Sequence, residues 1–290
     1  MATTSAASGG SSELRNGVGR VLRARTTTLL LINLAVAAFL AMVQPRFLDP
    51  ENLTSLVMGM TYDLLMAMGM TLILILGGID LSVGSVLGLA GVVVTMLLSN
   101  HIMPVPVPVP LAILAGMAVA ALCGAFNGFG VARLKIAPFI VTLSMFAIAR
   151  GIATVLTSGW YISGLPESYL VIGQGAVLGI PLPVIITLSI LVVFGLLLSR
   201  WKPLNQAYFI GQNPNAAALS GIRVTLVTFV AYIISSLLAG LAGVFMTSRL
   251  AMGFFQFGLG SELNAIAGAV IGGASFAGGS GTLLGTFLAL

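Results

Sequence analysis

The stretch Gly77-Gly78-Ile79-Asp80-Leu81-Ser82 interrupts a long apolar sequence. No acidic residue, lysine or arginine occurs from residue 64 to 79 or from 81 to 132, so Asp80 is an isolated acid beside two glycines. A charged side chain is costly in hydrocarbon and usually faces a protein interior or a wet cavity. The stretch therefore predicts a discontinuous membrane helix, of the kind that many transporters place at their substrate path.

The composition of the whole chain supports a membrane protein. Hydrophobic residues make up 58% of the 290 residues and charged residues 7%, whereas soluble domains are about 25% charged. Because the apolar runs are continuous rather than alternating, helices are favoured over a barrel. We predict an all-α, polytopic transmembrane helical bundle with discontinuous helices, in which about seven to ten spans are possible.

The distribution of basic residues predicts the orientation. Residues 1–25 form a basic segment that we expect to be a disordered cytoplasmic tail, and residues 26–290 form the transmembrane domain. A retained first helix is favoured over a cleaved signal peptide, because the apolar run continues beyond the candidate cleavage site. The positive-inside rule then places residues 158–180 in an outer loop and residues 203–223 in an inner loop. Arg46 and Arg249 fall outside, and the basic residues expected inside are Arg15, Arg20, Arg23, Arg25, Arg133, Lys135, Arg200, Lys202 and Arg223.

Catalytic and metal chemistry have little support in the sequence. Lys135 and Lys202 are the only lysines, and neither follows glycine, so the phosphate-binding loop of ATPases is absent from the sequence. The single His101 excludes an HExxH zinc motif, and the single Cys123 excludes an internal disulfide. We expect no enzymatic activity, no metal site and no cofactor in this chain.

Two hypotheses describe Asp80. Its carboxylate, assisted by Ser82, is expected either to cap the helix that starts near Leu81 or to contact a solute directly. Both place a helix N-terminus near the candidate path. A second Gly-Gly pair, Gly272-Gly273, also precedes an apolar, small-residue segment. Whether the two segments form a structural repeat stays open at this point.

The predicted inner loop contains a short helix signal. Asn213 is suited to the N-cap, Pro214 to the first turn and Gly221 to the position that follows the helix. Such a helix between basic groups is either an ordinary loop element or a docking surface for a partner.

Four segments carry a resemblance to a known family. They are GGIDLSVGSVLGLAG (77–91), NGFGVARLKIAPFIVTLSMFAIARG (127–151), IGQNPNAAALSGI (210–222) and SELNAIAGAVIGGASFAGGSGT (261–282). In this order they resemble the permease subunits of bacterial ABC importers for ribose, xylose, galactose and related monosaccharides. The resemblance implies a multi-pass protein of the bacterial cytoplasmic (inner) membrane with a cytoplasmic N-terminus. It also implies a second permease subunit, cytoplasmic ATPases that bind the ATP, and an extracytoplasmic sugar-binding protein.

The resemblance also assigns candidate residues. It implies a helix that couples the permease to the ATPase within residues 211–221, and the candidates there are Gly211, Asn213, Ala216, Ala217, Leu219, Ser220 and Gly221. The candidates for the translocation path or for helix breaks are Gly77, Gly78, Asp80, Ser82, Asn127, Gly272 and Gly273. The alternatives are an ion-coupled secondary transporter of a small polar solute, which would use Asp63 and Asp80, and a membrane enzyme.

The chain departs from the family pattern in a few places. Asp63 stands where relatives often carry asparagine, Asn264 where they often carry aspartate, and Asn215 where they often carry an acid. We expect these differences to retune gating or coupling. Asp63 and Arg150 are charges within predicted spans and are candidates for an ion pair. Since relatives continue through further spans beyond the position of Leu290, we expect the sequence to be truncated at its C-terminus.

Overall fold

The computed structural model describes residues 9–105 and 107–290. The chain divides into a unit that ends at Asn52 and a unit from Leu53 to Leu290, and each is described by itself. The first unit consists of helix α1 (Gly9–Val43), the 3₁₀-helix η1 (Pro45–Leu48) and the first residues of α2. Residues 1–8 of the predicted tail lie outside the described residues, and the helical backbone of α1 runs without interruption from Gly9 into the apolar segment 26–43.

The second unit is almost entirely helical. Its only strands, within the described residues, are the short antiparallel pair β1 (Ala176–Val177) and β2 (Ile180–Pro181). Its helices are α2 (Pro50–Ile75), α3 (Val83–Leu98), α4 (Val109–Gly128), the π-helix η2 (Phe129–Arg133), α5 (Pro138–Thr157), α6 (Glu167–Gln174), α7 (Leu182–Arg200), α8 (Lys202–Gln212), α9 (Pro214–Leu219), α10 (Val224–Leu250), α11 (Ser261–Ile271) and α12 (Leu283–Ala289).

Six helices of the described chain are long and apolar enough to cross a bilayer, namely α1 from Thr26, α2, α4 with η2, α5, α7 and α10. Of the two shorter apolar helices, α3 lies between α2 and α4 in sequence, and α11 follows α10. The predicted all-α membrane fold is therefore confirmed. The two predicted loops contain more structure than expected, since 158–180 includes α6 and most of the β1–β2 hairpin, and 203–223 includes α9 and nearly all of α8.

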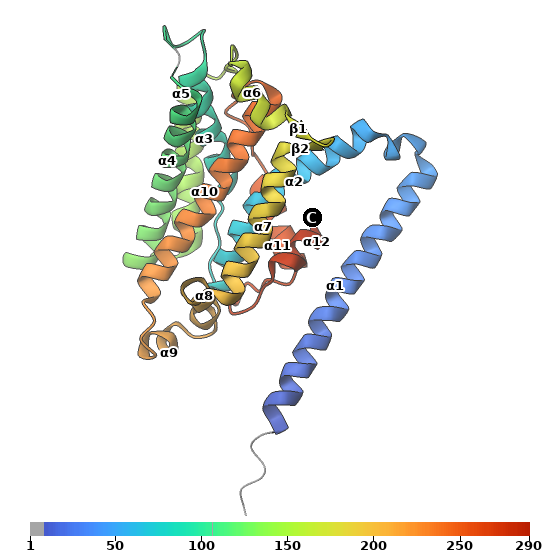
Figure 1. Ribbon diagram of the computed structural model, residues 1–290. Coiled ribbons are helices and arrows are strands. Elements are labelled where there is room, and N and C mark those ends of the chain that lie inside the picture. Colours follow the sequence, from blue (N-terminus) through green and yellow to red (C-terminus); the bar gives the residue numbers. More distant parts are fainter. Residues whose placement is uncertain (1–8, 106) are drawn as a thin grey trace, which may run out of the picture. The chain divides into compact units, whose positions relative to one another are not determined.

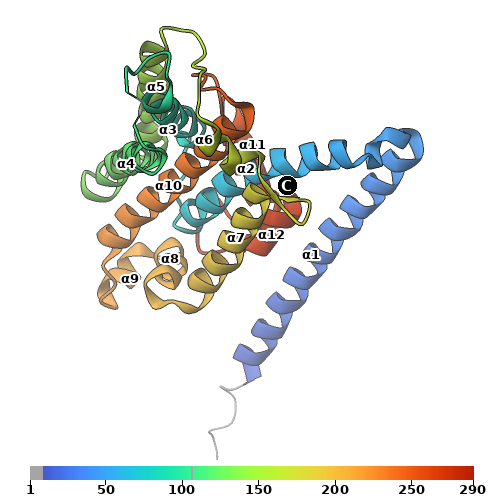
Figure 2. The same cartoon turned by 45° about the horizontal axis from the view of Figure 1, so that its top comes forward.

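Small residues allow the central helices to approach closely. α10 packs along α3 and α4, and α3 also contacts α5 (Figures 1 and 2). Gly91 of α3 lies against Gly243 of α10, and Gly240 of α10 lies against Ala120 of α4. Helices in membranes commonly associate through such residues, because backbone contact replaces the hydrophobic driving force that water would supply.

The second unit has two chemically different ends. α8 and α9 lie at one end, and α6 with the β1–β2 hairpin lies at the other (Figures 1 and 2). A bridge between Ile162 and Gly253 ties the loops at the α6 end. The basic residues at or near helix termini around α9 are Arg133, Lys135, Arg200, Lys202 and Arg223, whereas Arg249 lies in the last turn of α10 at the opposite end.

Candidate functional site

The first helix break follows α2 and has a defined C-terminal cap. The Gly77 N–H donates to Leu74 O over 2.9 Å, and the Gly78 N–H donates to Ile73 O over 2.9 Å. This pair of bonds is the Schellman motif, in which the residue after the helix adopts a left-handed conformation. Gly77 occupies that position with φ of 79°, which glycine adopts without a steric penalty.

Asp80 is the centre of a buried polar network after this break. Its carboxylate accepts hydrogen bonds from the Ser82 N–H (3.0 Å), the Ser82 hydroxyl (2.6 Å) and the Ser235 hydroxyl (3.1 Å). The Asn127 amide donates to Ser82 Oγ over 2.8 Å. All four side chains have an exposed fraction of 0%. The network therefore ties the start of α3 to α4 and α10.

The position of Ser235 gives the depth of the break. Ser235 lies 11 residues after Val224, where the 27-residue α10 begins, and this corresponds to about 17 Å along the helix. Asp80 consequently lies well inside the bundle and not at its α9 end. The carboxylate binds the N–H of Ser82, which is the N-cap of α3. It holds the turn into α3 at the N-cap residue and not through the N–H groups of the first helical turn, and it also binds α10, which the capping hypothesis did not include.

The second helix break follows α11 and has the same cap. The Gly273 N–H donates to Val270 O over 3.0 Å, and the Ala274 N–H donates to Ala269 O over 2.9 Å. Gly273 has φ of 110°. The two Gly-Gly pairs thus serve the same local function in the structure, but with an offset of one residue, because the left-handed position is the first glycine of Gly77-Gly78 and the second of Gly272-Gly273.

The two breaks meet at the end of α8. The Gly279 N–H, from the loop after α11, donates to Ile75 O at the end of α2 over 2.8 Å. The Tyr208 hydroxyl of α8 donates to Gly281 O in the same loop over 2.9 Å. Gly211 lies between them, since a Cβ atom at Gly211 would overlap Ile75 O and Gly279 N. α8 is therefore in direct backbone contact with both breaks.

The short helix α9 follows α8 after one extended residue. Asn213 is its N-cap, and the side-chain oxygen accepts from the N–H groups of Asn215 and Ala216, each over 3.0 Å. Gly221 follows the helix with φ of 83°. The predicted caps are thus found where the sequence placed them. The predicted coupling segment 211–221 is however split, because Gly211 belongs to the last turn of α8 and only the residues from Pro214 to Leu219 form α9.

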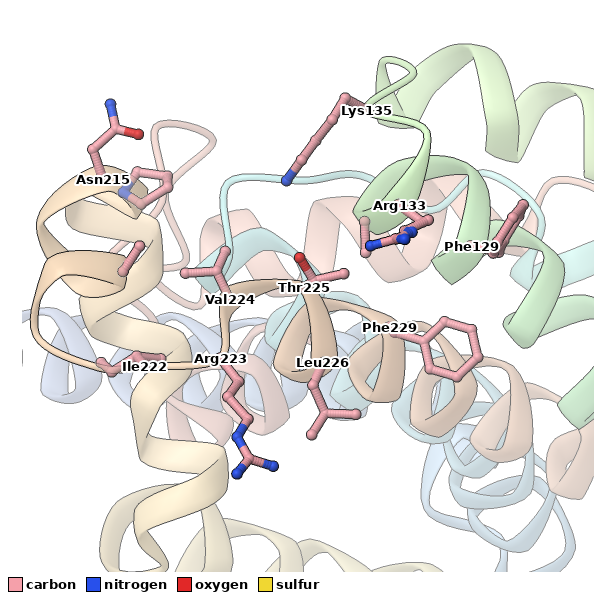
Figure 3. A pocket seen from close by; sticks show the side chains of 13 residues that line it. Phe129, Arg133, Lys135, Asn215, Ile222, Arg223, Val224, Thr225, Leu226 and Phe229 are labelled. Atoms are coloured by element: carbon pink, nitrogen blue, oxygen red, sulfur yellow. The ribbon is translucent and has the colours of Figure 1, made fainter.

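The residues of α9 differ in exposure. Ala217 is buried, whereas Leu219 has 91% of its surface exposed. A pocket of about 680 Å³ opens beside the helix, between α9, the start of α10 and the segment 129–135 (Figure 3). The segment that the resemblance assigns to ATPase coupling therefore presents the exposed side chain of Leu219, and an open pocket lies beside its helix α9.

The charges within the spans do not pair as expected. Asp63 accepts a hydrogen bond from the Asn264 amide over 3.3 Å, so two of the departures from the family pattern contact each other. Arg150 donates instead to the carbonyl oxygens of Phe255 and Phe257 (the latter over 2.9 Å), and thereby holds the loop between α10 and α11. Asp63 and Arg150 do not form the suggested ion pair.

Several residues of this site were missed in the sequence. Ser235 and Tyr208 are ordinary polar residues at helix positions, and nothing local distinguishes them. Gly278, Gly279 and Gly281 form a glycine-rich run that could have indicated close backbone approach. Their contacts with Ile75 and Gly211 join segments that are distant in sequence, which no local pattern reveals.

Six long apolar helices, with capped breaks after α2 and α11, define a multi-pass membrane protein. The chain belongs to the family described as the permease component of the branched-chain amino acid transport system, whose sequence profile matches residues 52–289.

Its relatives include permeases named for sugars. The chain is 38% identical to the ribose import permease protein of Bacillus subtilis (strain 168), over 86% of this chain and 76% of the relative. It is 36% identical to the D-allose transport system permease protein of Escherichia coli (strain K12), over 88% and 77%. It is 32% identical to the L-arabinose ABC transporter permease protein of Azospirillum brasilense, over 94% and 79%. No solved structure matches the chain. These names support the predicted importer permease and not the ion-coupled alternative.

Proposed function

We propose that this chain is the membrane subunit of an ATP-driven importer that carries a monosaccharide into a bacterial cell. The proposal is carried by the family match over residues 52–289 together with the relatives named for ribose, allose and arabinose. A second permease subunit, cytoplasmic ATPases and an extracytoplasmic sugar-binding protein complete the system. The ATP is bound by the ATPases, and this chain supplies the path and the conformational change.

The N-terminus and the α9 end of the bundle face the cytoplasm in this proposal. The support is the basic group at that end, Arg133, Lys135, Arg200, Lys202 and Arg223, against Arg249 at the other. An excess of basic residues marks cytoplasmic loops. The membrane is then the bacterial inner membrane.

α9 is the ATPase docking helix in this proposal. Leu219 is the apolar side chain available to a groove in the partner, since 91% of its surface is exposed. Asn213 and Gly221 fix the two ends of the helix, so that its position is maintained before the partner binds.

α8 transmits the movement of α9 to the membrane path. Gly211 contacts Ile75 and Gly279, and Tyr208 binds Gly281. A displacement of α8 therefore acts on both helix breaks at once. The glycines at the breaks, Gly77, Gly78, Gly272 and Gly273, are accordingly hinge candidates. Asp80, Ser82 and Asn127 are fully buried, and we assign them to the support of the first break rather than to sugar contact.

The experiment that tests the function is uptake by reconstituted liposomes. The chain is purified with candidate ATPase and sugar-binding proteins from the same genome, and uptake of labelled ribose, allose and arabinose is measured with and without ATP. We expect uptake of at least one of these sugars only with ATP and a hydrolysis-competent ATPase. Undiminished uptake without ATP would exclude the importer.

Thiol labelling of intact cells tests the orientation, and thiol crosslinking to the ATPase tests the docking helix. Leu178 and Leu219 have 99% and 91% of their surface exposed and lie in the β1–β2 turn and in α9. The variant Leu178→Cys should react with a membrane-impermeant maleimide added to intact cells, and Leu219→Cys should not. Leu219→Cys should crosslink to the ATPase, with Leu178→Cys as the control. The reverse labelling pattern would invert the proposed orientation.

A further inference from the structure

The pocket beside α9 has a basic rim without a carboxylate. Arg133, Lys135 and Arg223 line it, and no acidic residue described by the structure does. Within the described part of the chain no ion pair or hydrogen bond involves the side chains of these three residues. The pocket therefore has an uncompensated positive charge.

The three basic side chains do not all point the same way. Figure 3 shows Arg133 and Lys135 directed toward Thr225 in the first turn of α10, whereas Arg223 extends to the other side of that helix. A single anionic group can consequently lie between Arg133, Lys135 and the Thr225 hydroxyl. Phosphate oxygens accept hydrogen bonds from all three kinds of donor.

The rest of the lining is apolar and belongs to membrane-spanning helices. Phe129 and Leu226 are 51% and 50% exposed, and Phe229 lies one turn further along α10. These residues are in the long apolar stretches Val109–Arg133 and Val224–Leu250. Because the aromatic and aliphatic surface continues from the basic rim into the spans, an occupant with an anionic head and a hydrocarbon tail matches both parts.

We propose that this pocket binds an anionic phospholipid, with its phosphate between Arg133 and Lys135 and an acyl chain against Phe129 and Phe229. Basic pockets between membrane helices on the cytoplasmic side are suited to such headgroups. A carboxylate of the ATPase would satisfy the rim alone and would leave the apolar part of the pocket uncovered. The proposal rests on the orientation proposed above.

The lipid would also touch the docking helix. Pro214, Asn215 and Ala218 of α9 form the remaining wall of the pocket. An anionic lipid in this pocket thus contacts α9, α10 and the π-helix η2 together, and it would stabilise the docking helix against the membrane-spanning part of the permease.

Native mass spectrometry of the purified full chain tests the proposal. Binding of phosphatidylglycerol and phosphatidylcholine is titrated for the unmodified protein, for Arg133→Gln/Lys135→Gln and for Arg200→Gln/Lys202→Gln. The second pair removes the same charge from exposed residues at the same end of the bundle, outside the pocket. We expect phosphatidylglycerol to be preferred, and its affinity to fall roughly 25-fold in the Arg133/Lys135 variant, at about a factor of five for each basic residue. The Arg200/Lys202 variant should keep its affinity.

A third variant separates the lipid from a protein partner. Phe129→Ser leaves the charges in place and removes apolar surface, so it should also weaken phosphatidylglycerol binding. Equal lipid binding by the two double variants would overturn the proposal. The proposal would also be overturned if Arg133→Gln/Lys135→Gln bound lipid as the unmodified protein does but no longer co-purified with the ATPase. Failure of the unmodified chain to bind any ATPase would count against the proposed function and leave the lipid result intact. Elution as a single species and unchanged helicity by circular dichroism confirm that each variant is folded.

Discussion

The two helix breaks have the same cap but different surroundings. After α2, the chain turns into a buried network in which Asp80 receives three hydrogen bonds within the bundle. After α11, no comparable carboxylate follows, and the glycine-rich loop is held by Ile75 and by Tyr208. The first break is therefore held by a buried carboxylate network with α4 and α10, while the loop of the second break is held by hydrogen bonds with α2 and α8. We therefore expect the second break to move more readily with α8 than the first.

The largest effect is expected at the first break. Asp80→Ala leaves the three donors of Ser82 and Ser235 without their acceptor, and a buried donor that loses its partner costs about 1–3 kcal/mol. We expect the free energy of unfolding to fall by on the order of 3 kcal/mol. Asp80→Asn retains one acceptor oxygen and should lose much less. The thermal unfolding midpoint in one detergent gives the comparison, with the exposed Asp49→Ala as a control. An Asp80→Ala protein as stable as the original would remove the distinction between the breaks.

A smaller effect is expected where the breaks meet. Gly211→Ala places a methyl group against backbone atoms of Ile75 and Gly279, and such overpacking costs about 1–3 kcal/mol. The methyl group should also push the two breaks away from α8. We therefore expect the rate of ATP-dependent uptake to fall strongly even under conditions in which the variant remains folded. Gly59→Ala is the matched control, since it is also helical and has no atom within 4 Å of the added carbon. Normal uptake by Gly211→Ala would rule out transmission through this contact.

The smallest effect compares one tyrosine at each break. The Tyr208 hydroxyl donates to Gly281 O over 2.9 Å, and the Tyr232 hydroxyl donates to Ile79 O over 3.4 Å. Tyr208→Phe should cost about 1 kcal/mol of stability, and Tyr232→Phe less, because its bond is longer. If the second break is the mobile one, the uptake rate should change in Tyr208→Phe and stay the same in Tyr232→Phe. A changed uptake rate in Tyr232→Phe with an unchanged rate in Tyr208→Phe would indicate that the first break is the mobile one.

Local signals in the sequence predicted much of the fold. The apolar run from Pro138 to Thr157, in which Arg150 is the single charged residue, predicts a helix, and α5 has those bounds. Asn213 and Gly221 predicted the ends of α9, because caps depend on residues within one turn. Helix α6 was missed inside a glycine-containing loop, although Pro166 and Glu167 are typical of a helix start.

The candidate site depends on contacts that no local pattern contains. Asp80 was singled out because it is the only acid in a long apolar sequence, but its partner Ser235 lies on another helix. Gly211 was assigned to the coupling segment by the resemblance, whereas the structure places it in α8, packed on Ile75 and Gly279. These contacts arise from tertiary packing, which places residues 75, 211 and 279 together only after the bundle has formed.

The extended residue Asn213 and the left-handed residue Gly221 make α9 a helix that is structurally separate from its neighbours. The backbone leaves α8 at Asn213 with φ of −158° and leaves α9 at Gly221 with φ of 83°, so neither end of α9 continues a neighbouring helix. Residues 213–221 of another permease should therefore be transplantable without disturbing the α8 contacts. A chimera of this kind would bind the ATPase of the donor system and would still transport the sugar of the recipient system.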